Sequence, residues 1–423
     1  MRTRFYNAKI LTMKDGEEII DGEIFVKDDH IQYVGPHKHE PSDFDRQINV
    51  NGNLLMPGFK NAHTHSAMVF LRSLADDLPL GSWLNDAVFP REAKLTKEDI
   101  YHLSKVAILE YLTSGITAVF EMYLTPDSIA DAFGEMGMRC VQTGGLNDFS
   151  QSVEQMEDWY LRLNKKDEFN SFIPGFHAEY TCSEALLMDV AALAHKYEAP
   201  VWCHNSETKS EVESCKQKHD GLTPTQYLDS LGIFDYGGGG YHCVYLSDED
   251  VEIFKKRKMG IVTNPASNAK LASGMLDVTP FLEAGIEMGI GTDGPASNNC
   301  LDMFREMFLT EAYAKIRQSN AAALDAAKVL HMATVGGARV MNLKDCDILA
   351  EGKKADIIMI DLKKPNMQLV NNILKNLVYA GSKDNVKMTM INGVIKYSDG
   401  EFYVGEDIEK IYEKAQEITD RLK

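Results

Sequence analysis

The sequence lacks the hydrophobic signatures of membrane-spanning and exported proteins. It contains no run of about 18 uninterrupted apolar residues, the length that suggests a membrane-spanning helix. Its first residues, MRTRFYNAKILTMKDG, include no apolar core of a secretory signal. It also has no long Lys/Arg run, and 63 acidic residues against 44 basic ones give a net charge of −19. Such a surface disfavours nucleic acid and anionic membranes as partners, so we expect a cytoplasmic protein.

Signatures of several other protein classes are also missing. The seven cysteines include no C-x-x-C pair, and buried free thiols in a reducing compartment fit them better than disulfides. No Walker A and no G-x-S-x-G motif occurs. GIGTDG at 289–294 matches G-x-G-x-x-G, but it lies deep in the chain and its Asp293 would crowd a pyrophosphate. HAE at 177–179 matches the H-x-E of cytidine-type zinc deaminases, but no P-C-x-x-C completes that site.

The two ends of the 423-residue chain are similar in style and differ from its middle. Short strand-like runs separated by hairpin signals such as KDG and VNGN fill residues 1–55, and the same style returns at 346–400. These two segments predict one small β-sandwich-like domain formed from both termini. Residues 401–423 predict a C-terminal helix, because apolar residues such as Ile411 and Ile418 recur there at helical spacing and form a docking stripe.

The middle of the chain, residues 56–345, alternates eight short apolar runs with longer helical stretches. The runs include GITAVFEMY, APVWCHNSE and EMGIGTDG. This alternation predicts an α/β fold, a (β/α)8 TIM-type barrel. Several runs are apolar at the front and polar or ionisable at the back. Because a barrel gathers the carboxyl ends of its strands at one face, we expect these polar tails to converge.

Three histidines and one aspartate end different strands of the predicted barrel. His63 and His65 lie in NAHTH, and side chains at i and i+2 of a strand leave from the same face. His204 ends the fifth run in WCHNSE, and Asp293 ends the eighth in GTDG. Taken singly, each has an ordinary structural reading as a polar turn or a hydrogen-bonded strand end. Together they form a ligand set suited to one Zn²⁺ or Fe²⁺ ion with a position left for water.

Groups that can transfer protons accompany this ligand set. Glu207 lies three residues after His204, and His242 ends the sixth run in GYHC. A bound cation lowers the pKa of its water to about 7. Asp293 and His242 are then candidates to accept the proton of that water, and Glu207 is a candidate to deliver one to the leaving side of a substrate. The alternatives are a solvated carboxylate at a helix start for Glu207 and a strand-end histidine satisfied by backbone for His242.

The motifs PGFKNAHTH, HNSE, YHCVYLSDED, NPASNAKLASG and GTDGPASNNCLDMFREM resemble those of the amidohydrolase superfamily, and within it the 5'-methylthioadenosine/S-adenosylhomocysteine deaminases. The resemblance covers nearly the whole chain, and NPASNAKLASG and GTDGPASNN are its most specific parts. It implies a hydrolytic deaminase that releases ammonia from adenine nucleosides such as 5'-methylthioadenosine, S-adenosylhomocysteine or adenosine.

The resemblance also implies roles for individual residues. It implies one divalent metal, Zn²⁺ first and Fe²⁺ as the alternative, bound by four ligands: His63, His65, His204 and Asp293. Glu207 is expected to protonate the purine ring nitrogen, and His242 to help activate the water. Three further residues are expected to contact the substrate with Glu207: Glu92, His177 and Ser297. Glu92 matches the position that holds the ribose hydroxyls.

Two departures from the family pattern concern the substrate. Members that bind a substrate carboxylate carry an arginine just after the third strand, whereas no arginine occurs between Arg139 and Arg162. Glu179 replaces the proline of the usual His-Ala-Pro-Tyr-Thr run, and a carboxylate near the pocket mouth would disfavour anionic groups. The sequence leaves open the exact substrate, zinc against iron, and whether the chain forms a homo-oligomer.

Two other functions compete with nucleoside deamination. The first is an amidohydrolase that acts on another amino-heterocycle, such as guanine or a triazine, for which Glu92 would be dispensable. The second is a non-catalytic barrel that serves as a scaffold or binding protein. Retention of every expected metal ligand argues against the scaffold.

Overall fold

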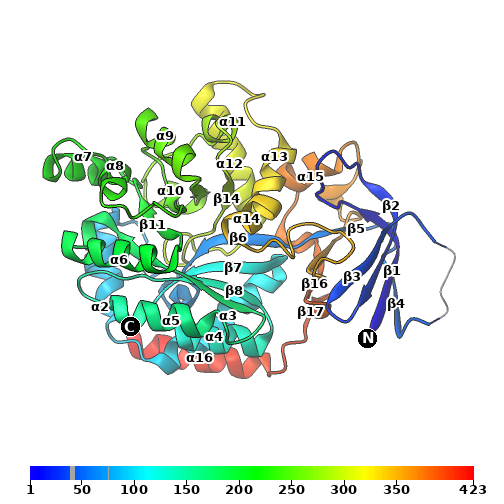
Figure 1. Cartoon of the computed structure of the whole chain (residues 1–423). Helices are drawn as coiled ribbons and strands as arrows, with labels where there is room; N and C mark the ends of the chain where they lie inside the picture. The colour runs from blue at the N-terminus through cyan, green and yellow to red at the C-terminus, as the bar shows by residue number, and fades with distance from the viewer. Residues whose placement is uncertain (39–42, 75) are drawn as a thin grey trace.

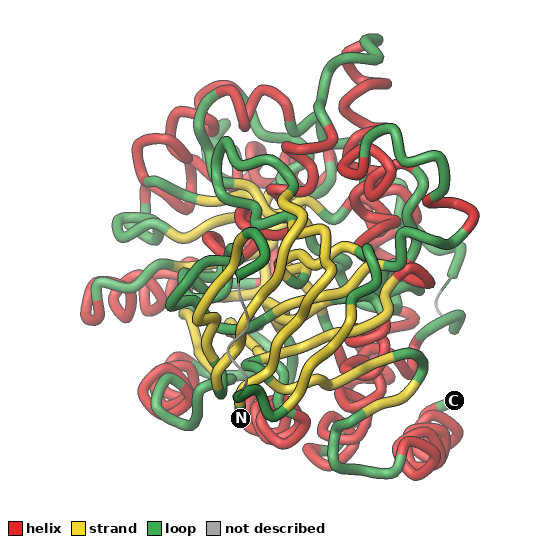
Figure 2. The backbone as a smooth tube through the Cα atoms, turned by 90° about the vertical axis from the view of Figure 1, so that its right-hand side faces the viewer, coloured by secondary structure: helices red, strands yellow, loops and turns green. Residues whose placement is uncertain are grey.

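Two groups of strands organise the molecule, one from the ends of the chain and one from its middle (Figure 1). The computed structural model describes residues 1–38, 43–74 and 76–423. Strands from the two ends form one nine-stranded sheet, which faces the viewer in Figure 2, in the order β18-β17-β16-β15-β5-β1-β2-β3 with β4 paired to β1. Their bounds are β1 Arg2–Ile10, β2 Ile20–Lys27, β3 His30–Gly35, β4 Arg46–Asn49, β5 Leu54–Pro57, β15 Ile357–Ile360, β16 Val386–Ile391, β17 Val394–Ser398 and β18 Glu401–Phe402.

Strand β15 contacts a different hydrophobic core on each of its faces. Ile357 and Met359 belong to the core of the nine-stranded sheet, while Ile358 and Ile360 belong to the large core shared with the barrel. Successive side chains of a strand point to opposite faces, so a strand between two cores is apolar at every position, as IIMI is. The sheet is therefore packed against the barrel, and the predicted domain boundaries stay a prediction.

Eight parallel strand segments from the middle of the chain close into a barrel. Strands β6 to β9 form one sheet and β10 to β14 another. β9 and β10 are one segment interrupted at Pro174, which has no N–H for the ladder. The last segment returns to the first through a hydrogen bond from the Asp293 N–H to the His63 carbonyl, at 2.9 Å. The bounds are β6 Phe59–Thr64, β7 Ile116–Met122, β8 Arg139–Thr143, β9 Asn170–Ile173, β10 Gly175–Ala178, β11 Val201–Asn205, β12 Gly238–His242, β13 Gly260–Thr263 and β14 Met288–Ile290.

Helices follow the barrel strands and lie outside them, which confirms the predicted (β/α)8 arrangement (Figure 1). The longer ones are α3 Lys97–Thr113, α4 Pro126–Met136, α5 Val153–Leu163, α6 Glu184–Tyr197, α7 Lys209–Lys218, α8 Pro224–Ser230, α9 Asp248–Arg257, α12 Met303–Gln318, α15 Ile373–Tyr379 and α16 Ile408–Leu422. The shorter ones are α1 Leu80–Ser82, α2 Phe89–Glu92, α10 Pro265–Lys270, α11 Thr279–Glu283, α13 Ala326–His331 and α14 Gly337–Val340. Across the described residues, no helix has both the length and the apolar character to cross a membrane.

Local sequence explains where several of these helices begin. Helices α3, α7, α8 and α9 each start with a capping box, in which a Thr or Ser side chain and the residue three positions later satisfy each other's backbone N–H. The C-terminal helix α16 packs on α3 through the apolar residues Ile411, Ile418 and Leu422. Arg421 adds an ion pair to Asp99 at 2.5 Å. The apolar stripe that the helical spacing predicts for residues 401–423 thus forms the buried face of α16.

A buried ion pair joins the barrel to the nine-stranded sheet. Arg139, the first residue of β8, donates from Nε to Asp356 Oδ2 at 2.6 Å and from Nη2 to Asn392 Oδ1 at 2.9 Å. The Asn392 N–H donates to Asp356 at 2.8 Å. Burial opposes ionisation of Asp356, but the charge and hydrogen bonds of Arg139 outweigh it and hold its pKa below the usual value.

We expect Asp356→Asn to lower the free energy of unfolding by roughly 3–5 kcal/mol at neutral pH, because it leaves Arg139 buried without a counter-charge. Asp356 has a lower pKa in the folded than in the unfolded chain. Its contribution is therefore present above the unfolded pKa of about 3.9 and is lost as the pH falls through the folded pKa. Urea unfolding at pH 7 and pH 3 measures both effects.

Asp158→Asn is the matched control, since it removes the exposed partner of Arg162 at 2.7 Å. An exposed pair contributes little, so this variant should unfold close to the parent chain. Equal losses in the two variants would contradict the role assigned to the buried pair.

Candidate active site

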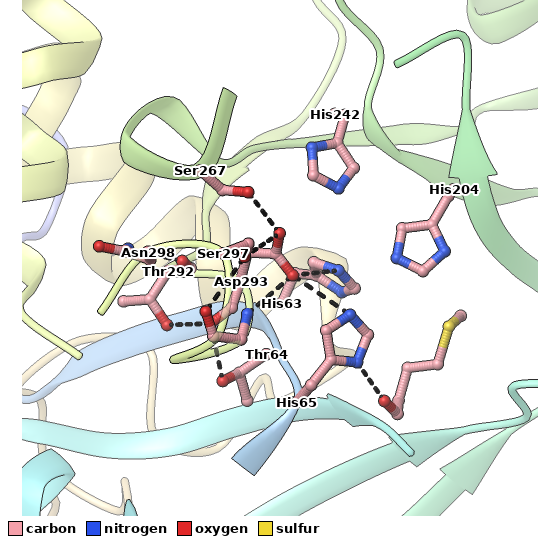
Figure 3. Close-up of polar contacts among 12 residues, drawn as sticks. His63, Thr64, His65, His204, His242, Ser267, Thr292, Asp293, Ser297 and Asn298 are labelled. Atoms are coloured by element: carbon pink, nitrogen blue, oxygen red, sulfur yellow. Dashed lines mark hydrogen bonds and ion pairs between the residues drawn. The ribbon is translucent and has the colours of Figure 1, made fainter. Parts of the chain in front are cut away.

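Four side chains from separate parts of the barrel converge on one point (Figure 3). His63 lies on β6 and His65 just after it, His204 lies on β11, and Asp293 follows β14. The Nε2 atoms of His63 and His65 are 3.6 and 3.2 Å from Asp293 Oδ1. The ring centroid of His204 is 5.0 Å from that of His63 and 5.5 Å from that of His65. The structure thus brings together all four side chains that the sequence singled out as ligands.

Asp293 is held by hydrogen bonds to both of its carboxylate oxygens. The hydroxyls of Ser267 and Ser297 donate to Oδ2 at 2.6 and 2.8 Å, and the Gly294 N–H donates to Oδ1 at 2.7 Å. Its φ of 58° lies in the left-handed region that non-glycine residues rarely adopt. This strained backbone turns the carboxylate toward the histidines.

Backbone carbonyls orient two of the histidines. The Nδ1 atom of His65 contacts the Met122 carbonyl, and that of His204 lies 2.8 Å from the His177 carbonyl. An Nδ1–H that donates to a carbonyl leaves the lone pair on Nε2. Second partners of this kind commonly set the tautomer of a metal-binding histidine. Both Nε2 atoms are therefore available to a cation.

His63 provides the clearest test of whether the residues fit a cation. The residue is fully buried, its ring stacks on Tyr241 with centroids 3.8 Å apart, and neither ring nitrogen has a hydrogen-bond partner among the described residues. Buried polar atoms without a partner are rare. The donor atoms of His63 lie within 4.8 Å of those of His65 and His204, and also of those of His242 and Asp293. A divalent cation among them would satisfy one of the two unpaired nitrogens of His63.

The electrostatics of the cluster also suit a cation. Burial lowers the pKa of His63 and His204 well below the usual value, and that of His177 to about 4. Burial likewise opposes protonation of His65, but the hydrogen bond and charge of Asp293 outweigh it and raise its pKa to about 9. Burial opposes ionisation of Asp293, yet His65 holds its pKa well below the usual range. The ionised carboxylate of Asp293 and the neutral imidazoles of His63 and His204 belong to a donor set that Zn²⁺ binds, and a bound cation would replace the second proton of His65 beside that carboxylate.

Glu207 and His242 lie next to each other beside this donor set. Their Oε2 and Nε2 atoms are 3.9 Å apart, and both side chains are buried. The Ser273 hydroxyl donates to Glu207 Oε1 at 2.9 Å, and His242 Nδ1 is 2.7 Å from Asn268 Oδ1. A carboxyl group and an imidazole are thus held in place near one point, which is the arrangement that paired proton transfers need.

A cavity of 540 Å³ opens onto these groups. Glu92 and His177 lie on its wall, and burial raises the pKa of the Glu92 carboxyl. The apolar part of the wall includes Leu80, Trp83, Phe89, Phe149 and Leu271. None of the described lining residues is lysine or arginine. The cavity therefore suits a neutral molecule with an aromatic or aliphatic body and a few polar groups.

Two residues lie elsewhere than the sequence suggested. Ser297 is 1% exposed and does not line the cavity. Its hydroxyl donates a hydrogen bond to Asp293, so it holds that carboxylate in place and does not face the cavity. Glu179 is also absent from the wall, because its carboxylate is buried and turned to His219 at 3.0 Å. The expected effect of Glu179 at the pocket mouth is therefore wrong.

Sequence reasoning missed the residues that hold the functional side chains in place. Ser267, Asn268 and Ser273 each bond to a different one of them: Asp293, His242 and Glu207. All three supports lie in NPASNAKLASG, which marked the family but did not reveal which side chain each residue contacts. The buried Glu306 of α12 accepts hydrogen bonds from the Ala266 N–H at 3.0 Å and from Asn298 at 2.8 Å. It thereby joins this segment to the turn after Asp293.

Comparison with known proteins places the chain in a family. The profile of the amidohydrolase family matches residues 54–396. The chain belongs to this family. A 5-methylthioadenosine/S-adenosylhomocysteine deaminase of Thermoanaerobacter pseudethanolicus is 38% identical, over 98% of each chain. A 5'-deoxyadenosine deaminase of Methanothermobacter thermautotrophicus is 36% identical, over 93% of this amidohydrolase and 94% of the relative.

The fold of this amidohydrolase also matches a solved structure. An adenosine deaminase from Xanthomonas campestris with bound zinc superposes with a TM-score of 0.93 at 30% identity. The match covers 99% of this chain and 98% of the other. It confirms the predicted fold class, and the family match confirms the resemblance drawn from the motifs.

For this amidohydrolase, we expect His63→Ala and Asp293→Asn each to lower the divalent metal content by one equivalent per chain. Each change removes a donor from the cluster, and an ion with too few protein donors exchanges into solvent on dialysis. Elemental analysis of the dialysed protein measures the loss, and circular dichroism checks that the variants are folded.

His195→Ala is the control, because His195 pairs with Asp235 on the surface at 3.0 Å, away from the cluster. It should keep the metal content of the parent chain. Unchanged metal in both cluster variants would show that these residues do not bind the ion.

Proposed function

We propose that this amidohydrolase is a hydrolytic deaminase of adenine nucleosides that works with one zinc ion. The observation that carries the proposal is the buried pair of Glu207 and His242, with Oε2 and Nε2 3.9 Å apart on the cavity wall beside the four-residue donor set. Two relatives named as deaminases of adenine nucleosides, and a zinc-containing adenosine deaminase of the same fold, support it.

The reaction needs proton transfers at two positions. Zinc supplies a Lewis acid that lowers the pKa of water to about 7. His242 directs Nδ1 to Asn268 Oδ1, which leaves Nε2 to accept a proton from the attacking water. Ser273 occupies Oε1 of Glu207, so Oε2 is left to deliver a proton to the purine ring nitrogen. A carbon–oxygen bond replaces the bond to the exocyclic amine, and one water proton leaves with ammonia while the other stays on the ring.

The cavity wall favours nucleosides with a neutral 5'-substituent. Glu92 and His177 both line the cavity, and in this proposal Glu92 accepts hydrogen bonds from the ribose hydroxyls while His177 is a second polar contact for the nucleoside. Trp83 and Phe149 offer apolar surface to a methyl, methylthio or hydroxymethyl group. A homocysteine tail carries a carboxylate and an ammonium group. Because the part of the wall that the structure describes contains no lysine or arginine, that carboxylate would lose water without gaining a cationic partner there.

Ammonia release from a panel of substrates tests the proposal. We expect turnover of 5'-methylthioadenosine, 5'-deoxyadenosine and adenosine, and a kcat/KM at least about tenfold lower for S-adenosylhomocysteine. A tenfold loss corresponds to about 1.4 kcal/mol, within the range for leaving one polar group unpaired. Equal turnover of S-adenosylhomocysteine would overturn the specificity alone, whereas no ammonia from any amino-purine or amino-pyrimidine would overturn the deaminase.

Glu207→Gln is the catalytic control for this panel. Glutamine keeps the shape of the side chain but cannot transfer a proton, so kcat should fall by about 10²–10⁴ while the metal content stays unchanged. Glu213→Gln, which changes an exposed carboxylate of the following helix, should behave like the parent enzyme. A fully active Glu207→Gln variant would remove this residue from the mechanism.

Glu92→Ala separates nucleosides from free bases. We expect kcat/KM for adenosine to fall by about tenfold or more, since loss of a charged hydrogen-bond acceptor costs about 1.5–3 kcal/mol, while any turnover of adenine or guanine changes little. Steady-state kinetics on the two substrate types measures the difference, with Glu98→Ala on the exposed start of α3 as the control. Equal losses on both types would favour an enzyme for free amino-heterocycles.

A further inference from the structure

A second group of metal-binding side chains lies outside the active site. Glu179 is in a short 3-10 helix, η3 Glu179–Thr181, that follows β10. Cys215 lies on α7 and His219 is the C-cap residue of that helix. One donor atom from each of the three lies within 4.8 Å of the other two. Cys215 and His219 are four residues apart, a spacing that places two side chains on one helix face.

Packing fixes the geometry of this group. The Glu179 side chain is 4% exposed, with Oε1 3.0 Å from His219 Nε2. Its Oε2 is buried and has no hydrogen-bond partner among the described residues. Cys215 is fully buried, whereas the His219 side chain is 21% exposed. The His219 ring stacks on Tyr227 with centroids 3.6 Å apart and planes 15° from parallel, which restricts its rotation.

The chemistry of the three donors fits a borderline divalent ion. Thiolate, imidazole and carboxylate are all ligands of Zn²⁺, at about 2.0–2.3 Å. With Glu179 and Cys215 ionised and His219 neutral, a divalent ion would bring the net charge of the buried group to zero. An unpaired buried carboxylate oxygen calls for a partner, and such an ion supplies one. Partial exposure of His219 leaves a route for the ion to enter and for water to complete the coordination.

We propose that Glu179, Cys215 and His219 form a second zinc site, separate from the active centre. The site joins η3 to α7. The residue after Glu179, Tyr180, lines the substrate cavity, and α7 begins just after Glu207. The ion thus links two segments of the cavity wall that follow different barrel strands. Its role is structural, since all three donors lie off the cavity wall.

Cobalt substitution tests this site without reference to activity. A thiolate bound to Co²⁺ gives a charge-transfer absorption in the near ultraviolet, and the active-site donor set contains no sulfur. Metal-free full-length protein is titrated with Co²⁺, and excess ion is removed by gel filtration. We expect two Co²⁺ per chain and the thiolate band for the parent chain. Failure of the active-centre proposal would lower the stoichiometry but leave the band in place.

Variants assign the band to the three residues. Cys215→Ala and His219→Ala should each bind one Co²⁺ fewer, and Cys215→Ala should lose the band completely. Cys182→Ala, which changes a half-buried cysteine near Glu179, should keep both ions and the band. The proposal is overturned if the parent chain shows no thiolate band, or if the band survives in Cys215→Ala. Because the first outcome needs no variant, a folding defect in Cys215→Ala leaves the test decisive.

Discussion

The hydrogen bond from the Asp293 N–H to the His63 carbonyl, 2.9 Å long, holds the last strand segment of the barrel against the first. Asn61 and Thr292 reinforce the same seam, because the Thr292 N–H donates to Asn61 Oδ1 at 2.8 Å and Asn61 Nδ2 donates to Thr292 Oγ1 at 2.7 Å. His63 and Asp293 are also two of the four side chains proposed to bind the cation. The contact that closes the barrel therefore also sets the distance between two of the proposed metal ligands. The fold and the candidate site both depend on the contact between the first and the last barrel strand.

One segment after β13 positions groups that arrive from three other strands. Ser267, Asn268 and Ser273 reach Asp293, His242 and Glu207 with hydrogen bonds of 2.6, 2.7 and 2.9 Å. These hydrogen bonds fix the orientation of the side chains that the proposed reaction would use. Glu306 ties this segment to the turn after Asp293. Burial raises the pKa of Glu306 to about 8, so the carboxyl group that joins the two segments ionises less readily than an exposed one.

The substrate wall and the catalytic groups come from different kinds of structure. The side chains proposed to be catalytic lie at or just after strand ends, where the barrel fixes their spacing. Part of the cavity wall belongs to the short helices that follow β6, the first barrel strand; these wall residues are Leu80, Trp83, Phe89 and Glu92. Such loops vary more readily than strands. The proposed reaction therefore depends on residues that the barrel positions, while residues 80–93 supply much of the wall of the cavity in which a substrate would bind.

The sequence by itself determined the order of strands and helices and most of the convergent residues. Alternation of apolar runs with helical stretches predicts a barrel because buried parallel strands must be apolar on both faces. The polar residues that end those runs then have only one face on which to meet. His63, His65, His204 and Asp293 were identified in this way, since their positions relative to the strands are properties of the chain.

Only the tertiary structure decided where the remaining side chains point. Ser297 follows Asp293 by four residues, but its hydroxyl turns back to that carboxylate because Asp293 has a φ of 58°. The Glu179 side chain turns away from the cavity to contact His219. His219 lies forty residues further along the chain, so the spacing of nearby residues could not reveal this contact. A side chain's direction depends on the local backbone and on distant partners, and neither is encoded in the spacing of residue types.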